Sequence, residues 1–279
     1  MPPRIQLLGS TRLTRVVAPF LLEHDRARVV AIDPGDEDET RPWFAPLRQL
    51  ARDNGIPLGR RAADLVIDLD PDARPDQGEG VLVRVLAPKG AASADINRAL
   101  LIGGEWEMVV VEATGRAGWS RLTVEVRPED DARSLLDRAT VRGVEALAES
   151  LEGILGDATA VPLPRPLLNG RWRAQEGWIT WEQPAPRIVA RIRAASGPYG
   201  GARTHLGDTS IFLEDAELVS DVASQEFTPG TICGTDSGVL VSTGAGIVRL
   251  TTVRPSWRPQ RRAVDYAAEV GASVGYQFA

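Results

Sequence analysis

Reactive side chains are scarce in this sequence. Its 279 residues include a single cysteine, Cys233, and two histidines, His24 and His205. One cysteine excludes an internal disulfide, a thiolate metal cluster and a CxxC redox pair, so we expect Cys233 to be a small buried hydrophobe. His205 has no carboxylate or cysteine partner at metal-ligand spacing. The sequence therefore predicts no metal site.

Long apolar runs are also missing. No stretch approaches the roughly 18 residues that cross a bilayer, and Met1 to Arg4 leads into a strand-like segment instead of a signal sequence. We therefore expect a cytoplasmic protein with no membrane partner.

Positive charge is in deficit, because the net charge is -6 and the pI is about 5.2. Such a balance argues against a large, sequence-independent nucleic-acid surface. The local exception is the cluster of Arg258, Arg261 and Arg262. A cluster this small is more often a solvated surface than an RNA contact.

The composition is that of a globular protein, with 43% hydrophobic and 25% charged residues. The length suits one large α/β domain and one smaller domain. In the first part of the chain, strand-like apolar runs alternate with helical periodicity, which predicts a parallel-rich, Rossmann-like sheet covered on both faces. Strands are expected at 5–8, 28–32, 63–69, 81–87 and 108–111, and helices at 11–23, 44–51, 95–102 and 131–155.

The second part of the chain has a different pattern. Three prolines between residues 160 and 166 predict an extended connector. After it come a short amphipathic helix at 188–195 and several short strands separated by glycine-rich turns, which are typical of a small barrel. We predict a front domain over 1–159, a linker over 160–170 and a β-barrel domain over 171–279.

Several short motifs follow one another in an order that resembles the formyltransferase family, in the form of the methionyl-tRNA formyltransferases. The front half contributes Gly55-Ile56-Pro57 and the helix start at Pro128–Leu136. The back half contributes Ile179-Thr180-Trp181, Pro198–Ala202, Pro229-Gly230-Thr231-Ile232, Gly244–Leu250 and Ala263-Val264-Asp265-Tyr266. The resemblance implies a Rossmann-like formyltransferase domain followed by an OB-like C-terminal barrel.

The chemistry of such enzymes requires particular polar side chains on one strand. An amine attacks the formyl carbon of a folate, so the site needs a donor for the oxyanion and a base for the proton. The resemblance implies an Asn and a His on the strand that precedes Pro88, and here Val81 and Val83 occupy those positions. The family's Asp falls near Thr114 or Arg116. We therefore assign no catalytic residue, and neither His24 nor His205 lies on that strand.

Five residues near the same strand remain candidates for ligand binding. Arg84 and Arg116 have guanidinium groups that fit an anionic ligand, although arginines at such edges are commonly paired with surface acids. Trp106 and Trp119 could stack on a ring ligand or serve in ordinary packing. Glu112 is the carboxylate nearest to the altered loop and could act as an improvised catalytic group.

Three hypotheses for function follow. The leading one is a pseudoenzyme that lacks the Asn, His and Asp set and acts as a binding, scaffolding or partner-regulating protein, with an unknown protein or small molecule as its partner. Because the connector from Asp68 to Asp72 is shorter and more acidic than in the family, no folate cofactor is expected. The second is a divergent enzyme that uses 10-formyltetrahydrofolate for N-formyl or another one-carbon transfer. The third is a tRNA-binding module, but the acidic total leads us not to expect tRNA.

Overall fold

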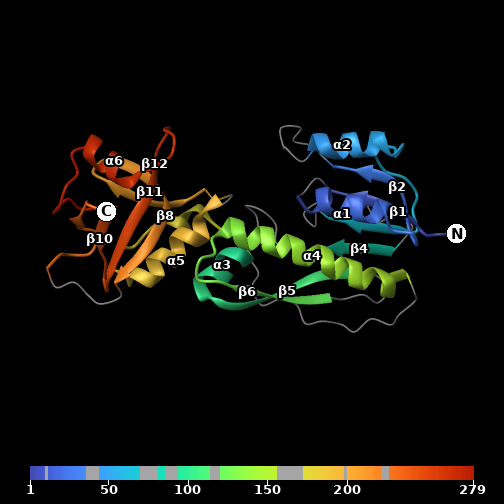
Figure 1. Ribbon diagram of the computed structural model, residues 1–279, viewed down its shortest axis with the longest axis horizontal. Coiled ribbons are helices and arrows are strands. Elements are labelled where there is room, and N and C mark those ends of the chain that lie inside the picture. Colours follow the sequence, from blue (N-terminus) through green and yellow to red (C-terminus); the bar gives the residue numbers. More distant parts are fainter. Residues whose placement is uncertain are drawn as a thin grey trace. The chain divides into compact units, whose positions relative to one another are not determined.

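The computed structural model describes residues 1–9, 12–35, 44–69, 81–85, 94–113, 120–155, 172–197, 200–220 and 226–279. Contacts divide the chain into two compact units. Figure 1 shows the chain coloured along the sequence, from blue at the N-terminus to red at the C-terminus. Unit 1 comprises residues 1–89, 106–124 and 137–167, and unit 2 comprises residues 90–105, 125–136 and 168–279. The units are thus interleaved along the chain, and the predicted linker at 160–170 lies outside the described residues.

One mixed sheet organises unit 1, in the strand order β2-β1-β3-β4-β5-β6. Its strands are β1 (Arg4–Leu8), β2 (Arg28–Asp33), β3 (Leu65–Asp68), β4 (Val81–Val85), β5 (Gly104–Ala113) and β6 (Ser120–Val126). The first four strands pair in parallel, as predicted, whereas β5 runs antiparallel to β4. The sequence pattern did not predict this reversal or strand β6.

Both faces of the central strand β1 are covered, as expected for a parallel strand. Successive side chains of a strand point to opposite faces, and Ile5, Gln6 and Leu7 of β1 are each at most 2% exposed. Helix α1 (Arg12–Leu22) packs on β1 and β2 and contacts α2 (Phe44–Asp53). The longest helix is α4 (Ala132–Leu155). No helix in the described part of the chain is long and apolar enough to span a membrane.

Helix α3 (Ala94–Ile102) belongs to unit 2, although it lies between two strands of the first sheet in sequence. It packs against α5 (Ala185–Ala195), where the Asn97 side-chain amide donates to the carbonyl of Ala194. Nearby, the backbone N–H of Ala132 donates to Ser196 Oγ. Because α3 packs in unit 2 and does not form a crossover on the sheet, β5 is free to return antiparallel to β4.

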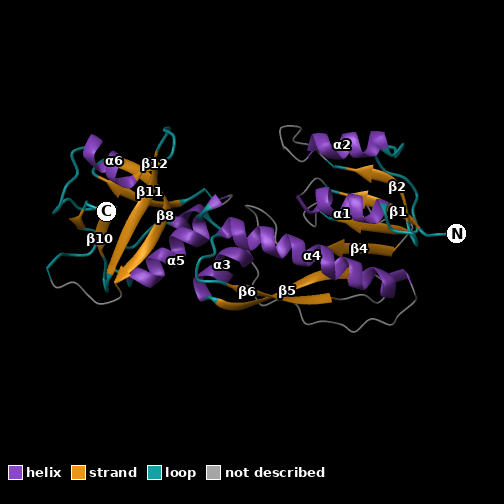
Figure 2. Cartoon of the chain, in the orientation of Figure 1, coloured by secondary structure: helices purple, strands orange, loops and turns teal. Residues whose placement is uncertain are grey.

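An antiparallel sheet makes up most of unit 2, in the order β7-β8-β11-β10-β9 with β12 paired to β11. Helix α5 covers β7, β8 and β11, and the sheet and helix are distinguished by colour in Figure 2. The remaining elements are β7 (Ala202–Leu206), β8 (Thr209–Ser220), β9 (Ile232–Gly234), β10 (Val239–Ser242), β11 (Ile247–Pro255), β12 (Arg261–Arg262), α6 (Ala263–Glu269) and the 3-10 helix η1 (Ala174–Gly177).

Residues 275–279 connect the two edge strands of this sheet. The backbone of His205, on β7, exchanges hydrogen bonds of 2.9 and 3.0 Å with Ala279. On the other side, the N–H of Phe278 donates to Gly230 at 2.8 Å, and that of Ile232 donates to Tyr276 at 2.8 Å. Both edges are therefore paired, which confirms the predicted barrel-like domain.

The closing segment needs glycine at position 230 and an aromatic core beneath it. Gly230 has a φ of 86°, and an added Cβ would lie 2.7 Å from the carbonyl oxygen of Phe278. The Phe278 ring lies 5.4 Å from that of Trp181, whose indole N–H donates to Thr204 Oγ1 at 3.0 Å. The Thr204 hydroxyl in turn donates to the carbonyl of Ala279 at 2.9 Å. Core packing and barrel closure thus depend on the same few residues.

Substituting Phe278 by alanine is expected to destabilise unit 2, because Phe278 is 5% exposed and its removal leaves a cavity beside Trp181. The free energy of unfolding should fall by about 3–5 kcal/mol in urea titrations. Val274→Ala is the control, because Val274 is 53% exposed and should change the stability by less than about 0.5 kcal/mol. Equal effects of the two substitutions would contradict closure by this segment.

Candidate functional site

The carboxyl ends of the parallel strands in unit 1 form the candidate site. From β1 the chain passes to β2 on one side, and from β2 it passes to β3 on the other side of β1. Ligands of open parallel sheets bind outside the carboxyl ends at such a switch point. Gly9 follows β1 there, while Asp33 ends β2 and Asp68 ends β3.

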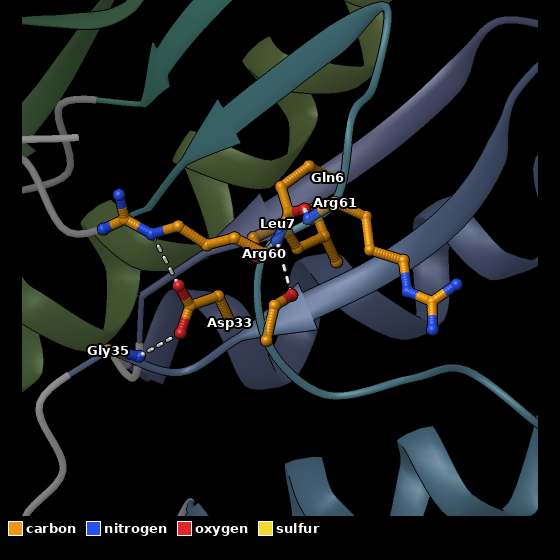
Figure 3. Close-up of polar contacts among 7 residues, drawn as sticks. Gln6, Leu7, Asp33, Gly35, Arg60 and Arg61 are labelled. Carbon is orange, nitrogen blue, oxygen red and sulfur yellow. Dashed lines mark hydrogen bonds and ion pairs between the residues drawn. The ribbon is translucent and has the colours of Figure 1, made fainter. Parts of the chain in front are cut away.

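Asp33 is held in place by two donors at this edge. The backbone N–H of Gly35 donates to its Oδ1 at 3.1 Å, and Arg60 Nε donates to its Oδ2 at 2.9 Å, as Figure 3 shows. The Arg60 side chain is 55% exposed, so the pair adds little stability. Its main effect is to place a guanidinium and a carboxylate together beside the end of β2.

Gln6 fixes the loop that carries Arg60. This side chain is 2% exposed, and its Oε1 accepts a hydrogen bond of 2.6 Å from the backbone N–H of Arg61. Its Nε2 donates to the carbonyl of Gly59 at 3.1 Å. Arg60 and Arg61 extend in opposite directions from this point in Figure 3. A buried, hydrogen-bonded amide of this kind rigidifies its surroundings.

The turn after β1 is also tightly defined. Gly9 has a φ of 109°, a conformation that favours glycine, and its N–H donates to the carbonyl of Asp33 at 2.9 Å. The Thr14 hydroxyl on α1 donates to the carbonyl of Gly9 at 3.1 Å. The ends of β1 and β2 are therefore joined directly.

Three charged positions lie in register across the centre of the sheet. Asp68, which is fully buried, is the partner of Arg84 on β4, and Arg84 is the partner of Glu112 on β5. The strand register thus places Arg84 between two acidic positions on neighbouring strands. Arg84 and Glu112, two of the predicted ligand-binding residues, are thus register partners on neighbouring strands.

Val83 is fully buried in the middle of β4, where its register partners are Ile67 on β3 and Ala113 on β5. Val81, the other valine singled out in the sequence, begins β4 and pairs with Leu65. Trp106 lies on β5.

The other predicted positions, Thr114, Arg116 and Trp119, fall in the segment 114–119, outside the described residues. Their roles in ligand binding therefore stay predictions.

Neither histidine of the chain lies on β4. His24 follows α1, where its ring packs edge-on against Phe20 at 5.8 Å and its Nε2 lies 3.7 Å from Glu152 Oε1. His205 lies on β7, and its ring stacks on Trp178 at 4.9 Å. Both imidazoles are thus in contacts away from the strand where the resemblance implies one.

Sequence reasoning missed the cluster of Gln6, Asp33 and Arg60. Asp33 could have been found, because it directly ends a buried strand in the first strand-helix-strand unit. The pairing of Arg60 could not, because it depends on the path of a loop 27 residues further along the chain. Gln6 is a polar residue in an apolar run, and its partners are visible only in three dimensions.

Comparison with known proteins gives matches along the whole chain. The family model "Formyl transferase, C-terminal domain" matches residues 171–270. Methionyl-tRNA formyltransferase of Mycobacterium avium (strain 104) is 28% identical to this chain. The alignment is 308 residues long and covers 96% of each chain.

Two solved structures share the fold. HypX from Aquifex aeolicus, in complex with tetrahydrofolic acid, superposes with a TM-score of 0.65 at 16% identity, over 98% of this chain and 48% of that one. An N-formyltransferase from Helicobacter canadensis, in complex with folinic acid and dTDP-3-aminofucose, gives a TM-score of 0.64 at 12% identity, over 88% and 98% of the two chains.

One expectation from the sequence is corrected by these relatives. The acidic total charge led us not to expect tRNA as a partner, yet the similar Mycobacterium avium protein is named for its action on methionyl-tRNA. A net charge of -6 averages over the whole surface, whereas binding of nucleic acid depends on local basic regions. The inference from total charge was therefore wrong.

The family model, the relative aligned over nearly the full length and the shared fold all agree. This chain belongs to the formyltransferase family.

Proposed function

We propose that this family member does not transfer formyl groups by an amide and imidazole mechanism, and that it acts by binding a partner. The observation that carries the proposal is Val83, which is fully buried in β4 at the position where the resemblance implies a histidine. Both histidines of the chain are accounted for elsewhere. A valine side chain neither accepts a proton nor forms a hydrogen bond.

The expected loss of rate is large. General base catalysis contributes about 10²- to 10⁴-fold, and one oxyanion donor contributes about 10²- to 10³-fold. Replacing both groups by Val81 and Val83 should therefore slow the reaction on the order of 10⁴-fold or more. Residual positioning of the substrates would not restore a useful rate.

The carboxyl edge also fits folate poorly. HypX is described in complex with tetrahydrofolic acid, a molecule with a carboxylate-bearing tail. In this chain the edge carries Asp33 and the buried Asp68, and the sequence continues with Asp70 and Asp72. Arg60 compensates the charge of Asp33, so the repulsion of a carboxylate-bearing ligand rests on Asp70 and Asp72, which follow β3 in the sequence. We therefore propose that folate is not a cofactor of this protein.

Binding is the function that the rest of the molecule can support. In the barrel-like unit, residues 275–279 pair with both edge strands, and Phe278 and Trp181 are buried beneath them. Since the Mycobacterium avium relative is named for methionyl-tRNA, tRNA is the first partner to test.

The purified protein should produce no formylmethionyl-tRNA from 10-formyltetrahydrofolate above the background rate, because β4 supplies neither base nor oxyanion donor. The measurement is a single-turnover assay read by mass spectrometry, with the Mycobacterium avium enzyme as the positive control. Turnover within 100-fold of that control would refute the proposal.

A second candidate, a divergent one-carbon transferase, is favoured by the register of Asp68, Arg84 and Glu112. If it is correct, transfer to some amine in a panel of amino sugars and aminoacyl-tRNAs should be detectable. Glu112→Gln and Arg84→Gln should each then reduce it at least about 100-fold, the scale of losing one general acid or base.

Glu105→Gln is the control for that experiment, because Glu105 lies on the same strand with an exposed side chain. Equal activity of all three variants would eliminate the divergent enzyme.

A further inference from the structure

The parallel part of the sheet in unit 1 carries an arginine–aspartate pair at each end, and the two pairs differ in geometry. At the amino end, Arg4 binds Asp64 through its backbone N–H, its Nη2 and its Nε, at 2.8, 3.0 and 3.3 Å. These bonds engage both carboxylate oxygens, so the two side chains satisfy each other. At the carboxyl end, Arg60 gives Asp33 a single hydrogen bond, from Nε at 2.9 Å.

The pair of Asp33 and Arg60 therefore keeps hydrogen-bonding capacity on both partners. The terminal nitrogens Nη1 and Nη2 of Arg60 have no dashed contact in Figure 3. Asp33 accepts one hydrogen bond on each oxygen, from Arg60 and from the backbone N–H of Gly35, whereas an ionised carboxylate can accept about four. The side chains are 19% and 55% exposed, respectively. Acceptors and donors thus lie side by side within reach of a ligand.

The loop that carries Arg60 is held to the end of β2 by polar contacts. The N–H of Gly59 donates to the carbonyl of Ile32 at 2.9 Å. The buried Gln6 amide bonds to the backbone of both Gly59 and Arg61, on either side of Arg60. A ligand at this edge therefore meets a guanidinium whose backbone is already in place, which lowers the entropy cost of binding.

Asp33 occupies a position with a known use in open α/β sheets. It ends β2 of the first strand-helix-strand unit, and the turn at Gly9 follows β1 beside it. In dinucleotide-binding sheets, an acidic residue at this place accepts a hydrogen bond from a ribose hydroxyl. The sequence after Gly9 lacks the G-x-G-x-x-G motif that cradles a pyrophosphate. The position therefore favours sugar hydroxyls over a phosphate.

The charges at this edge favour the same kind of ligand. Asp33 and Arg60 together carry no net charge, and an anion that approached Arg60 would also face the Asp33 carboxylate. A hydroxyl group both donates and accepts hydrogen bonds. Two neighbouring hydroxyls on a sugar ring can therefore use the carboxylate and the guanidinium at once.

We propose that the Asp33–Arg60 pair binds the vicinal diol of a sugar ring. One hydroxyl donates to an oxygen of Asp33, and its neighbour accepts from a terminal nitrogen of Arg60. The inference rests on the proposed binding role, for which it names a ligand class at the carboxyl edge, and not on the loss of formyl transfer. Turnover in the formylation assay would refute that loss alone, and failure of the sugar to bind would refute this inference alone.

Isothermal titration calorimetry with adenosine tests the proposal, because adenosine has the 2′,3′-diol and no phosphate. Removal of either hydroxyl, in 2′-deoxyadenosine or 3′-deoxyadenosine, should weaken binding about 10- to 100-fold, the scale of one hydrogen bond to a charged group. Methyl β-D-ribofuranoside distinguishes the two sources of the diol. Equal affinity for it would identify the sugar ring alone as the ligand, and weaker binding than adenosine would identify a nucleoside.

Asp33→Asn keeps an oxygen for the N–H of Gly35 but removes the charge, so it should weaken adenosine binding about 10-fold or more. Arg60→Gln should have an effect of similar size. Asp64→Asn is the matched control, because it breaks the corresponding pair at the opposite end of the same strands and should leave the affinity unchanged. Thermal midpoints of the three variants should agree, because both pairs lie at the surface.

Three results would overturn the proposal. The first is no binding of adenosine or the riboside with a dissociation constant below about 10 mM. The second is equal affinity for adenosine and its deoxy forms, or an Asp33→Asn variant that binds as well as the unaltered protein. The third is tighter binding of inorganic phosphate or adenosine 2′-phosphate than of adenosine, which would make Arg60 part of an anion site instead.

Discussion

The central structural constraint in unit 1 is the position of β4, which pairs with β3 on one side and with β5 on the other. It fixes Val83 beside Ile67 and Ala113 in a fully buried position. A slip of one residue would reverse every side chain of the strand between the two faces of the sheet, so the register determines what the strand presents. Parallel pairing with β3 and antiparallel pairing with β5 thus both hold Val83 in this buried position.

The two units depend on different interactions. Unit 1 joins strand ends through Gly9, Asp33 and Gln6, while unit 2 closes its sheet through residues 275–279. The hydrogen bonds that close unit 2 come from residues 205, 230, 232 and 275–279 and not from β4.

The sequence predicted most elements correctly, because their periodicity is local. The strands at 5–8 and 28–32 and the helix at 131–155 were all placed to within a few residues. Features that depend on distant partners were missed. Strand β6 and the antiparallel direction of β5 are set by sheet pairing, and closure by residues 275–279 is set by contacts with Gly230 and His205.

The candidate site was predicted only in part, for the same reason. The absence of a histidine on β4 could be seen from the sequence, whereas the pair of Asp33 and Arg60 could not. Trp257 shows another limit, since a tryptophan in a sequence gives no sign of a positive φ or of full exposure. The total charge misled us about tRNA because it carries no information on where the arginines lie.

The most direct test of the claim about β4 is a crystal structure of the chain after exposure to a high concentration of 5-formyltetrahydrofolate. We expect Val81 and Val83 to stay paired with Leu65 and Ile67 of β3, and no imidazole or carboxamide to lie within about 3.2 Å of any formyl group. A bound formyl group that accepts a hydrogen bond from such a side chain, with a base beside it, would contradict the proposed loss of formyl transfer.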